Sequence, residues 1–144
     1  MRRDSAAQRL IAQLGLSPHP EGGWYAETWR RPSGGGRGAG SAIYFLLRRG
    51  EVSRWHRVDA TEIWHFYAGQ PLQLQVAATS TPPRTVVLGP DVGAQQRPQA
   101  IVPAGAWQTA ATLGEFTLVG ATVSPAFELD GFELAPPGWQ PPAP

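Results

Sequence analysis

The chain has 144 residues, no cysteine and a formal net charge of only +1 at pH 7. The absence of cysteine excludes disulfides, thiolate metal sites and cysteine nucleophiles, and the weak charge gives no reason to expect a nucleic acid partner. The longest strongly apolar run, residues 42–47, is too short to span a bilayer. Polar residues also interrupt the N-terminal region where a signal peptide needs an apolar core. We therefore expect a cytoplasmic protein with no membrane partner.

The N-terminal region predicts one short helix, over residues 5–14. Ser5 and Gln8 have the spacing of a capping box. The apolar residues that follow recur about one turn apart and share a helical face. Gly15 comes next and is a natural stop, because glycine readily adopts the left-handed conformation that ends helices.

A strand entered through a tight turn is predicted within residues 19–31. Pro20 and Gly22-Gly23 are turn residues, and several aromatic residues follow them. We expect His19, directly before Pro20, to shape this turn. Residues 34–40 contain five glycines and predict a flexible loop. They lack the Gly-Lys-Ser/Thr ending of a phosphate-binding loop.

The rest of the chain predicts consecutive short strands without helices between them. Glycine and proline number 17 and 15, well above their average share, while 42% of the residues are apolar. This composition favours many turns between strands in an antiparallel sandwich or barrel. We expect a single domain over residues 1–135 and a mobile Pro-rich tail over 136–144. The predicted strands are 41–48, 51–58, 62–67, 72–78, 84–88, 99–102, 107–112 and 116–123.

Two segments carry spaced residues that point to a particular fold. Residues 50–69 begin and end with glycine and contain His56 and Glu62, with Val58 where a second histidine would complete a metal-binding set. Residues 103–108 then read Pro-Ala-Gly-Ala-Trp-Gln, a P-x-G-x-x-H spacing that ends in Gln108 instead of histidine. The two segments resemble the first and second cupin motifs. They predict an all-β cupin double-stranded β-helix (jelly roll), preceded by the short N-terminal helix.

Six blocks, spread over roughly residues 10–135, carry a more specific pattern. They are His19-Pro20-Glu21-Gly22-Gly23-Trp24, Ser41-Ala42-Ile43-Tyr44-Phe45-Leu46-Leu47, Ser53-Arg54-Trp55-His56-Arg57, Glu62-Ile63-Trp64-His65-Phe66, Val102-Pro103-Ala104-Gly105-Ala106-Trp107 and Ser124-Pro125-Ala126-Phe127-Glu128. This pattern resembles the DUF985 (Cupin_5) family of the RmlC-like cupin superfamily. The resemblance implies a β-sandwich that forms a homodimer, with a small-molecule pocket in each jelly roll. Such pockets are often compared with those of deoxysugar epimerases and other sugar-nucleotide cupins.

The alternation of side chains along a strand predicts which residues face the pocket. His56 and Val58 should point the same way, and Glu62, Trp64 and Phe66 should share a face on the next strand. With these faces turned inward, the pocket holds an imidazole and a carboxyl group over an aromatic floor. The residues then expected on the outer face are Ile63, His65 and Tyr67.

Cupins commonly hold a divalent metal with three histidines and a glutamate. The matching positions here leave His56, Glu62 and Gln108, and an amide oxygen is a weak donor to metals that prefer imidazole. We therefore expect no cofactor. A divalent metal held by these three residues remains an alternative.

Metal-free acid–base catalysis is the function that the sequence favours. An imidazole and a carboxyl group facing one substrate can move a proton next to a carbonyl, as in epimerases and isomerases acting on sugar-like or keto metabolites. We assign His56 as the base, Glu62 as its orienting partner or as an acid, and Tyr44 as a second acid. The alternative is a non-catalytic small-molecule-binding protein. The residues expected to contact the ligand are Trp64, Gln108, Trp107, Arg54 and Glu27.

Overall fold

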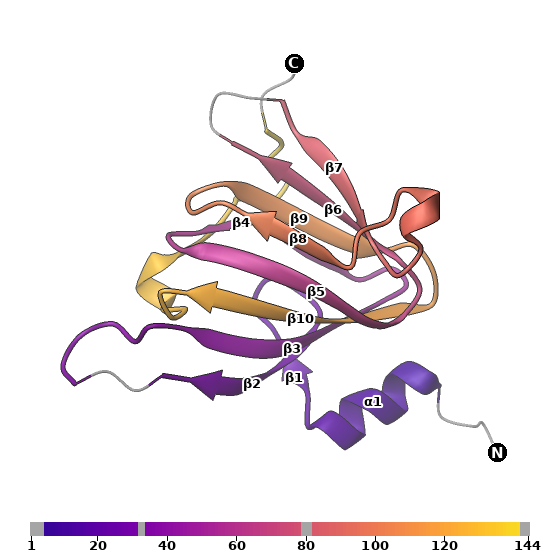
Figure 1. Cartoon of the computed structure of the whole chain (residues 1–144), viewed down its shortest axis with the longest axis horizontal. Coiled ribbons are helices and arrows are strands. Elements are labelled where there is room, and N and C mark those ends of the chain that lie inside the picture. Colours follow the sequence, from indigo (N-terminus) through magenta and orange to yellow (C-terminus); the bar gives the residue numbers. More distant parts are fainter. Residues whose placement is uncertain (1–4, 32–33, 79–81, 142–144) are drawn as a thin grey trace.

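The computed structural model describes residues 5–31, 34–78 and 82–141. Two antiparallel sheets face each other in a sandwich, and a short helix lies at one side (Figure 1). The elements in chain order are α1 (Ala6–Leu14), β1 (Ser17–Pro18), β2 (Trp24–Arg30), β3 (Ser41–Arg48), β4 (Val52–Val58), β5 (Thr61–Gly69), β6 (Leu72–Ala77), β7 (Arg84–Leu88), η1 (Val92–Ala94), β8 (Gln99–Val102), β9 (Trp107–Thr112), β10 (Phe116–Ser124), η2 (Leu129–Gly131) and β11 (Phe132–Leu134).

The strand order confirms the predicted all-β jelly roll. The six-stranded sheet has the order β1-β2-β3-β10-β5-β8, and the five-stranded sheet has the order β11-β4-β9-β6-β7. Consecutive strands such as β3 and β4, β4 and β5, or β9 and β10 therefore lie in opposite sheets, as a jelly roll requires. The predicted strands are all present and differ from the observed ones only at their ends. The short edge strands β1 and β11 were not predicted, because two or three residues carry no alternating pattern.

Helix α1 forms for the reasons expected from its sequence. The Ser5 hydroxyl accepts a hydrogen bond from the Gln8 amide at 3.1 Å, and the Gln8 side-chain oxygen accepts one from the Ser5 amide at 3.2 Å. Gly15 ends the helix in the left-handed conformation with φ of 66°. The apolar face packs against Leu46 and Leu118 on the outer face of the six-stranded sheet. The predicted capping box and helix stop are confirmed.

The main core fills the space between the two sheets. Phe45, Leu47, Trp64 and Val119 come from the six-stranded sheet, and the five-stranded sheet contributes leucines such as Leu74. All of these side chains are buried. The apolar packing leaves one end of the sandwich to polar side chains, and that end holds the cavity described below.

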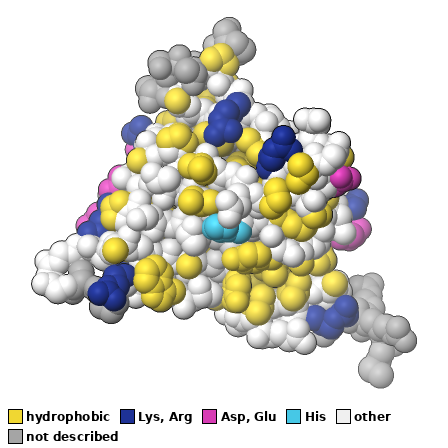
Figure 2. Space-filling model, viewed as in Figure 1, with side chains coloured by type: hydrophobic (Ala, Val, Ile, Leu, Met, Phe, Trp, Pro, Cys, Tyr) yellow, Lys and Arg dark blue, Asp and Glu magenta, His cyan; other side chains and the backbone are white. Residues whose placement is uncertain are grey.

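The outer face of the six-stranded sheet carries exposed apolar side chains. In the view of Figure 2, hydrophobic side chains gather on this face, while acidic side chains lie at the edges of the view. Tyr67 and Ile101 belong to this sheet and are 52% and 56% exposed. No helix among the described residues is long and apolar enough to cross a membrane.

The described part of the Pro-rich segment, residues 136–141, contacts the outer face of the five-stranded sheet. The indole of Trp139 lies 4.6 Å from that of Trp107 and 5.7 Å from that of Trp55, measured between ring centroids. The sequence predicted a mobile tail here and gave no indication of these contacts. Residues 142–144 of that tail lie outside the described residues.

Candidate functional site

A cavity of about 640 Å³ opens at one end of the sandwich, between the two sheets. Side chains from β2, β3, β5 and β10 on one side and β4 on the other line it, together with the segments before β2 and after β10. Aromatic rings such as Tyr25 and Phe132 form part of its wall. Its acidic and basic residues are His19, Glu21, Glu27, Arg30, His56, Glu62, Glu128 and Asp130.

The predicted facing of the side chains on β4 and β5 is confirmed. His56 and Val58 on β4 are 2% and 4% exposed, and both line the cavity. Glu62 on β5 is 8% exposed and also lines it, while Trp64 lies deeper at 2%. Residues 63 and 65 are only partly buried and Tyr67 is exposed, as expected for the outer face.

Glu21 is a central residue of the site that the sequence-based assignment missed. It lies in the turn before β2, where the Gly22 amide donates to the His19 carbonyl at 3.0 Å. Gly22 has φ of 109°, and a Cβ at this position would overlap the carbonyl oxygen of Val52. The turn therefore packs tightly on β4, and the Ser53 hydroxyl donates to Glu21 Oε1 at 3.0 Å. The sequence feature that could have indicated this role is an acidic residue placed between the turn residues Pro20 and Gly22-Gly23.

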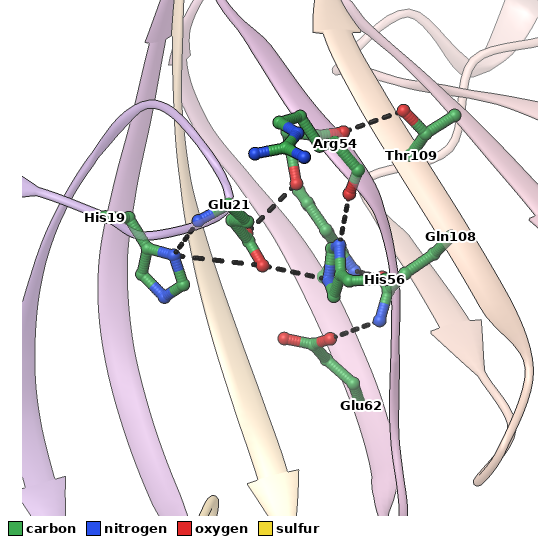
Figure 3. A network of polar contacts seen from close by, with 9 residues as sticks. His19, Glu21, Arg54, His56, Glu62, Gln108 and Thr109 are labelled. Carbon is green, nitrogen blue, oxygen red and sulfur yellow. Dashed lines mark hydrogen bonds and ion pairs between the residues drawn. The ribbon is translucent and has the colours of Figure 1, made fainter. Parts of the chain in front are cut away.

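Glu21 and His56 form a buried ion pair (Figure 3). His56 Nε2 lies 3.0 Å from Glu21 Oε2, and His56 Nδ1 lies 2.7 Å from the carbonyl oxygen of Arg54. A carboxylate and a carbonyl only accept hydrogen bonds, so both ring nitrogens carry protons and the imidazole is cationic. Burial lowers the pKa of His56, but the charge and hydrogen bond of Glu21 outweigh burial and raise the pKa to about 9.

The same pairing keeps Glu21 ionised. Burial alone raises the pKa of this carboxyl, whereas the charge and hydrogen bond of His56 lower it, and the net shift is downward. Neighbouring His19 accepts a hydrogen bond from the Glu21 amide at its Nδ1, at 3.1 Å. Burial lowers the pKa of His19 despite the nearby Glu21 charge. His19 is therefore neutral, with its proton on Nε2.

Glu62 is held by a second polar chain. The Trp64 indole N–H donates to Gln108 Oε1 at 2.8 Å, and Gln108 Nε2 donates to Glu62 Oε1 at 2.6 Å. Because an indole nitrogen only donates, it fixes which end of the amide faces Glu62. Burial raises the pKa of Glu62 to about 7, even though the His56 charge lowers it. A carboxyl with this pKa is partly protonated at neutral pH.

The second oxygen of Glu62 is open to the cavity. Glu62 Oε2 has no hydrogen-bond partner among the described residues. Every fully buried side-chain oxygen or nitrogen of the described residues does have a hydrogen-bond partner. This oxygen is thus not fully buried. Figure 3 shows it turned away from Gln108, on the side of His56 that also faces Glu21 and His19.

The side chains at this site do not fit the metal centre common in cupins. The side-chain oxygen of Gln108 accepts from Trp64, and both nitrogens of His56 are already engaged. Within the described ranges, no group of three or more His, Cys, Asp or Glu side chains is arranged to hold an ion.

Three residues assigned to the pocket from the sequence lie outside it. Tyr44 points to the outer face of its sheet, because its neighbour Ile43 faces the cavity, and it packs with the residues under α1. Trp107 also faces outward, since the adjacent Gln108 points inward, and the guanidinium of Arg57 lies 4.7 Å over its ring. The assignments of Tyr44 and Trp107 to the pocket are wrong.

Arg54 is the third such residue. An irregularity in the pairing of β4 with β9 falls between Ser53 and His56, and the Arg54 side chain is exposed on the outer face of the five-stranded sheet. Only its main-chain carbonyl takes part in the site, through His56. Assigning its side chain to the pocket is also wrong.

The remaining predicted contacts take different places. Trp64 and Gln108 lie behind Glu62 and do not line the cavity. Glu27 does line it, near the rim, where its carboxylate oxygens accept from Arg30 at 3.0 and 2.8 Å. Trp64 and Gln108 therefore act on a ligand only through Glu62.

Solved structures similar to this chain share its fold. A protein from Shewanella oneidensis is 41% identical, with a TM-score of 0.86 over 92% of this chain and 85% of its own. A hypothetical protein from Leishmania major is 32% identical, with a TM-score of 0.85 over 91% and 88%. Oxalate decarboxylase from Bacillus subtilis is only 10% identical, with a TM-score of 0.64 over 81% of this chain and 29% of its own, so it shows the fold alone.

No curated protein gives a significant match to the chain. The family model Cupin_5, described as "Cupin superfamily (DUF985)", matches residues 8–135, which is most of the chain and includes every residue of the polar network around His56 and Glu62. The expected resemblance is thereby confirmed. The chain belongs to the Cupin_5 (DUF985) family of the cupin superfamily.

Proposed function

We propose that this protein is an isomerase- or epimerase-type enzyme in which Glu62 moves a proton next to the carbonyl of a small sugar-like or keto substrate, without a metal. The observation that carries the proposal is a buried carboxyl with one oxygen open to the cavity and a pKa of about 7. A general acid–base group works best when its pKa lies near the operating pH.

The roles differ from those expected from the sequence. His56 is a poor base because both of its ring nitrogens already donate hydrogen bonds. Its fixed positive charge instead favours negative charge that develops on the substrate. Glu62 accepts the proton from the hydroxyl-bearing carbon beside the carbonyl, and an enolate forms. In isomerisation, a proton moves between the two oxygens of this intermediate and Glu62 returns its proton to the former carbonyl carbon. In epimerisation, the intermediate must first turn its other face to Glu62. The Nε2–H of neutral His19, which has no hydrogen-bond partner among the described residues, is suited to donate to the oxygen of this enolate.

The charges around the cavity favour an uncharged substrate. Glu21 is paired with His56 and Glu27 with Arg30, so these four residues contribute little net charge. Glu128 and Asp130 add negative charge to the lining. A phosphorylated or nucleotide-linked sugar would bring further negative charge to this acidic site, whereas a neutral sugar would not.

The test is solvent exchange in deuterium oxide. Neutral aldoses, neutral ketoses and small uncharged ketones are incubated with the protein, and mass spectrometry measures deuterium incorporation beside the carbonyl. We expect Glu62→Gln to lower the exchange rate by about 10²–10⁴-fold, the usual contribution of one proton-transfer group. Glu115→Gln is the matched control, because this carboxylate is highly exposed and pairs with Arg49. Binding without exchange would instead support the non-catalytic alternative.

The pH profile is an independent part of this test. Glu62 must be ionised to accept a proton, so we expect kcat/KM to rise as the pH passes about 7. The rate should fall again above about 9, where His56 loses its charge. A profile that is flat from pH 6 to 8 would contradict the role of Glu62.

A further inference from the structure

A second hollow lies on the outer face of the five-stranded sheet, away from the cavity that holds His56 and Glu62, called the catalytic cavity below. This outer groove has a volume of about 380 Å³ and runs between strands β4, β6 and β9 and the segment 135–140. We propose that the outer groove is a binding site for a carbohydrate that carries a carboxylate. Three observations support this: its aromatic wall, its unpaired polar side chains and its charge.

The aromatic wall is built by the C-terminal segment. Residues 136–139 form a turn in which the Trp139 amide donates to the Pro136 carbonyl at 3.1 Å, and Gly138 takes φ of 79°. The turn places the Trp139 indole against Trp107 and close to Trp55. Trp55 and Trp139 both line the groove. Fixed indoles of this kind pack against the C–H faces of sugar rings.

Four polar side chains of the groove have no partner in the described part of the chain. Gln73 and Gln75 alternate along β6, so both point to the outer face, and Arg54 and Gln140 also line the groove. None of these four side chains makes a hydrogen bond or an ion pair among the described residues, although the Arg54 main chain does. Gln73 and Gln75 are partly buried, and amides without partners are available to a ligand.

The chemistry of these groups selects the ligand class. An amide both donates and accepts, and so does each hydroxyl of a sugar. The guanidinium of Arg54 matches the geometry of a carboxylate. The lining of the outer groove contains no acidic residue, whereas the catalytic cavity is lined by several. The two sites therefore differ in charge, and an acidic sugar is favoured only by the outer groove.

The experiment is a titration of the whole protein with glucuronate, and with glucose as the neutral counterpart, followed by ¹H–¹⁵N NMR. We expect saturable shifts of the indole N–H signals of Trp55 and Trp139 and of the side-chain amides of Gln73 and Gln75. Arg54→Gln should weaken glucuronate binding by about tenfold or more, the effect of losing one charge-assisted hydrogen bond. Arg49→Gln, a change at a highly exposed arginine outside the groove, should leave the affinity unchanged.

Three outcomes would overturn the proposal. The first is the absence of saturable shifts in the unaltered protein. The second is equal affinity of Arg54→Gln and Arg49→Gln. The third is loss of glucuronate binding in Glu62→Gln with Arg54→Gln unaffected, which would place the sugar in the catalytic cavity. Retention of the Trp139 signals in the Arg54→Gln spectrum shows that this variant keeps its fold, so weakened binding reports on the guanidinium itself.

Discussion

Replacing Glu21 by glutamine tests the buried ion pair that organises the site. His56 has an ordinary pKa of 6.5 and a folded-state pKa of about 9, a difference that corresponds to about 3 kcal/mol of folding free energy. Because the folded-state value is the higher one, this stabilisation is fully present below pH 6.5 and is lost as the pH rises through 9. Glutamine has nearly the same shape but no charge, so it removes the cause of the shift.

The assay is urea unfolding at several pH values between 6 and 9, followed by tryptophan fluorescence. In the unaltered protein, we expect His56 by itself to lower the free energy of unfolding by about 3 kcal/mol across this range. In Glu21→Gln, burial favours neutral His56, so the pH dependence between pH 7 and 9 should largely disappear. The two stability curves should converge as the pH approaches 9, and Glu115→Gln should follow the unaltered protein.

One other buried group changes stability in the same direction but at lower pH. The pKa of Glu62 rises from 4.5 to about 7, so its contribution is present below pH 4.5 and is lost as the pH passes 7. The range from pH 7 to 9 therefore isolates His56. Identical slopes for Glu21→Gln and the unaltered protein in this range would refute the assignment of a cationic His56.

Two further substitutions test the supports of the site. Gln108→Leu leaves the Trp64 indole N–H and Glu62 without their partner. We therefore expect the free energy of unfolding, measured in urea, to fall by about 1–3 kcal/mol, and the pKa of Glu62 to rise further. An unchanged free energy of unfolding would contradict the role of Gln108 in this network. Gly22→Ala combines a positive φ with overlap on Val52, whereas Gly50→Ala at φ of 84° meets no atom within 4 Å. We therefore expect Gly22→Ala to lower the free energy of unfolding more than Gly50→Ala does, by on the order of 2 kcal/mol or more. Equal losses of stability in the two variants would show that the turn at Gly22 does not need close packing.

The spacing of glycine, histidine and glutamate along the chain was enough to identify the fold and two residues of the site. His56 and Glu62 face inward as predicted because both strands have one apolar core face, which fixes their alternation. Tyr44 was misplaced for the opposite reason. Its strand, β3, is covered by the core on one face and by α1 on the other, so apolar residues occur on both faces and the pattern carries no facing information.

Glu21 was missed because its role depends on contacts between distant parts of the chain. The Arg54 amide donates to the Glu21 carbonyl at 2.8 Å, and this bond joins the turn before β2 to β4 in the opposite sheet. No local pattern reports such a pairing. The same contact draws the Arg54 main chain into the site while its side chain points to the outer face.

The departures from the cupin metal motif make sense together in this structure. Val58 stands where a second histidine would be, and it packs with Val123, Phe127 and Phe132. Gln108, in the place of another histidine, supports Glu62. A metal would have supplied positive charge beside Glu62, and here the His56 imidazolium supplies it, because the Glu21 carboxylate keeps the ring protonated. Since that charge depends on Glu21, the proposed chemistry requires Glu21 as much as it requires Glu62, although in this proposal only Glu62 exchanges a proton with the substrate.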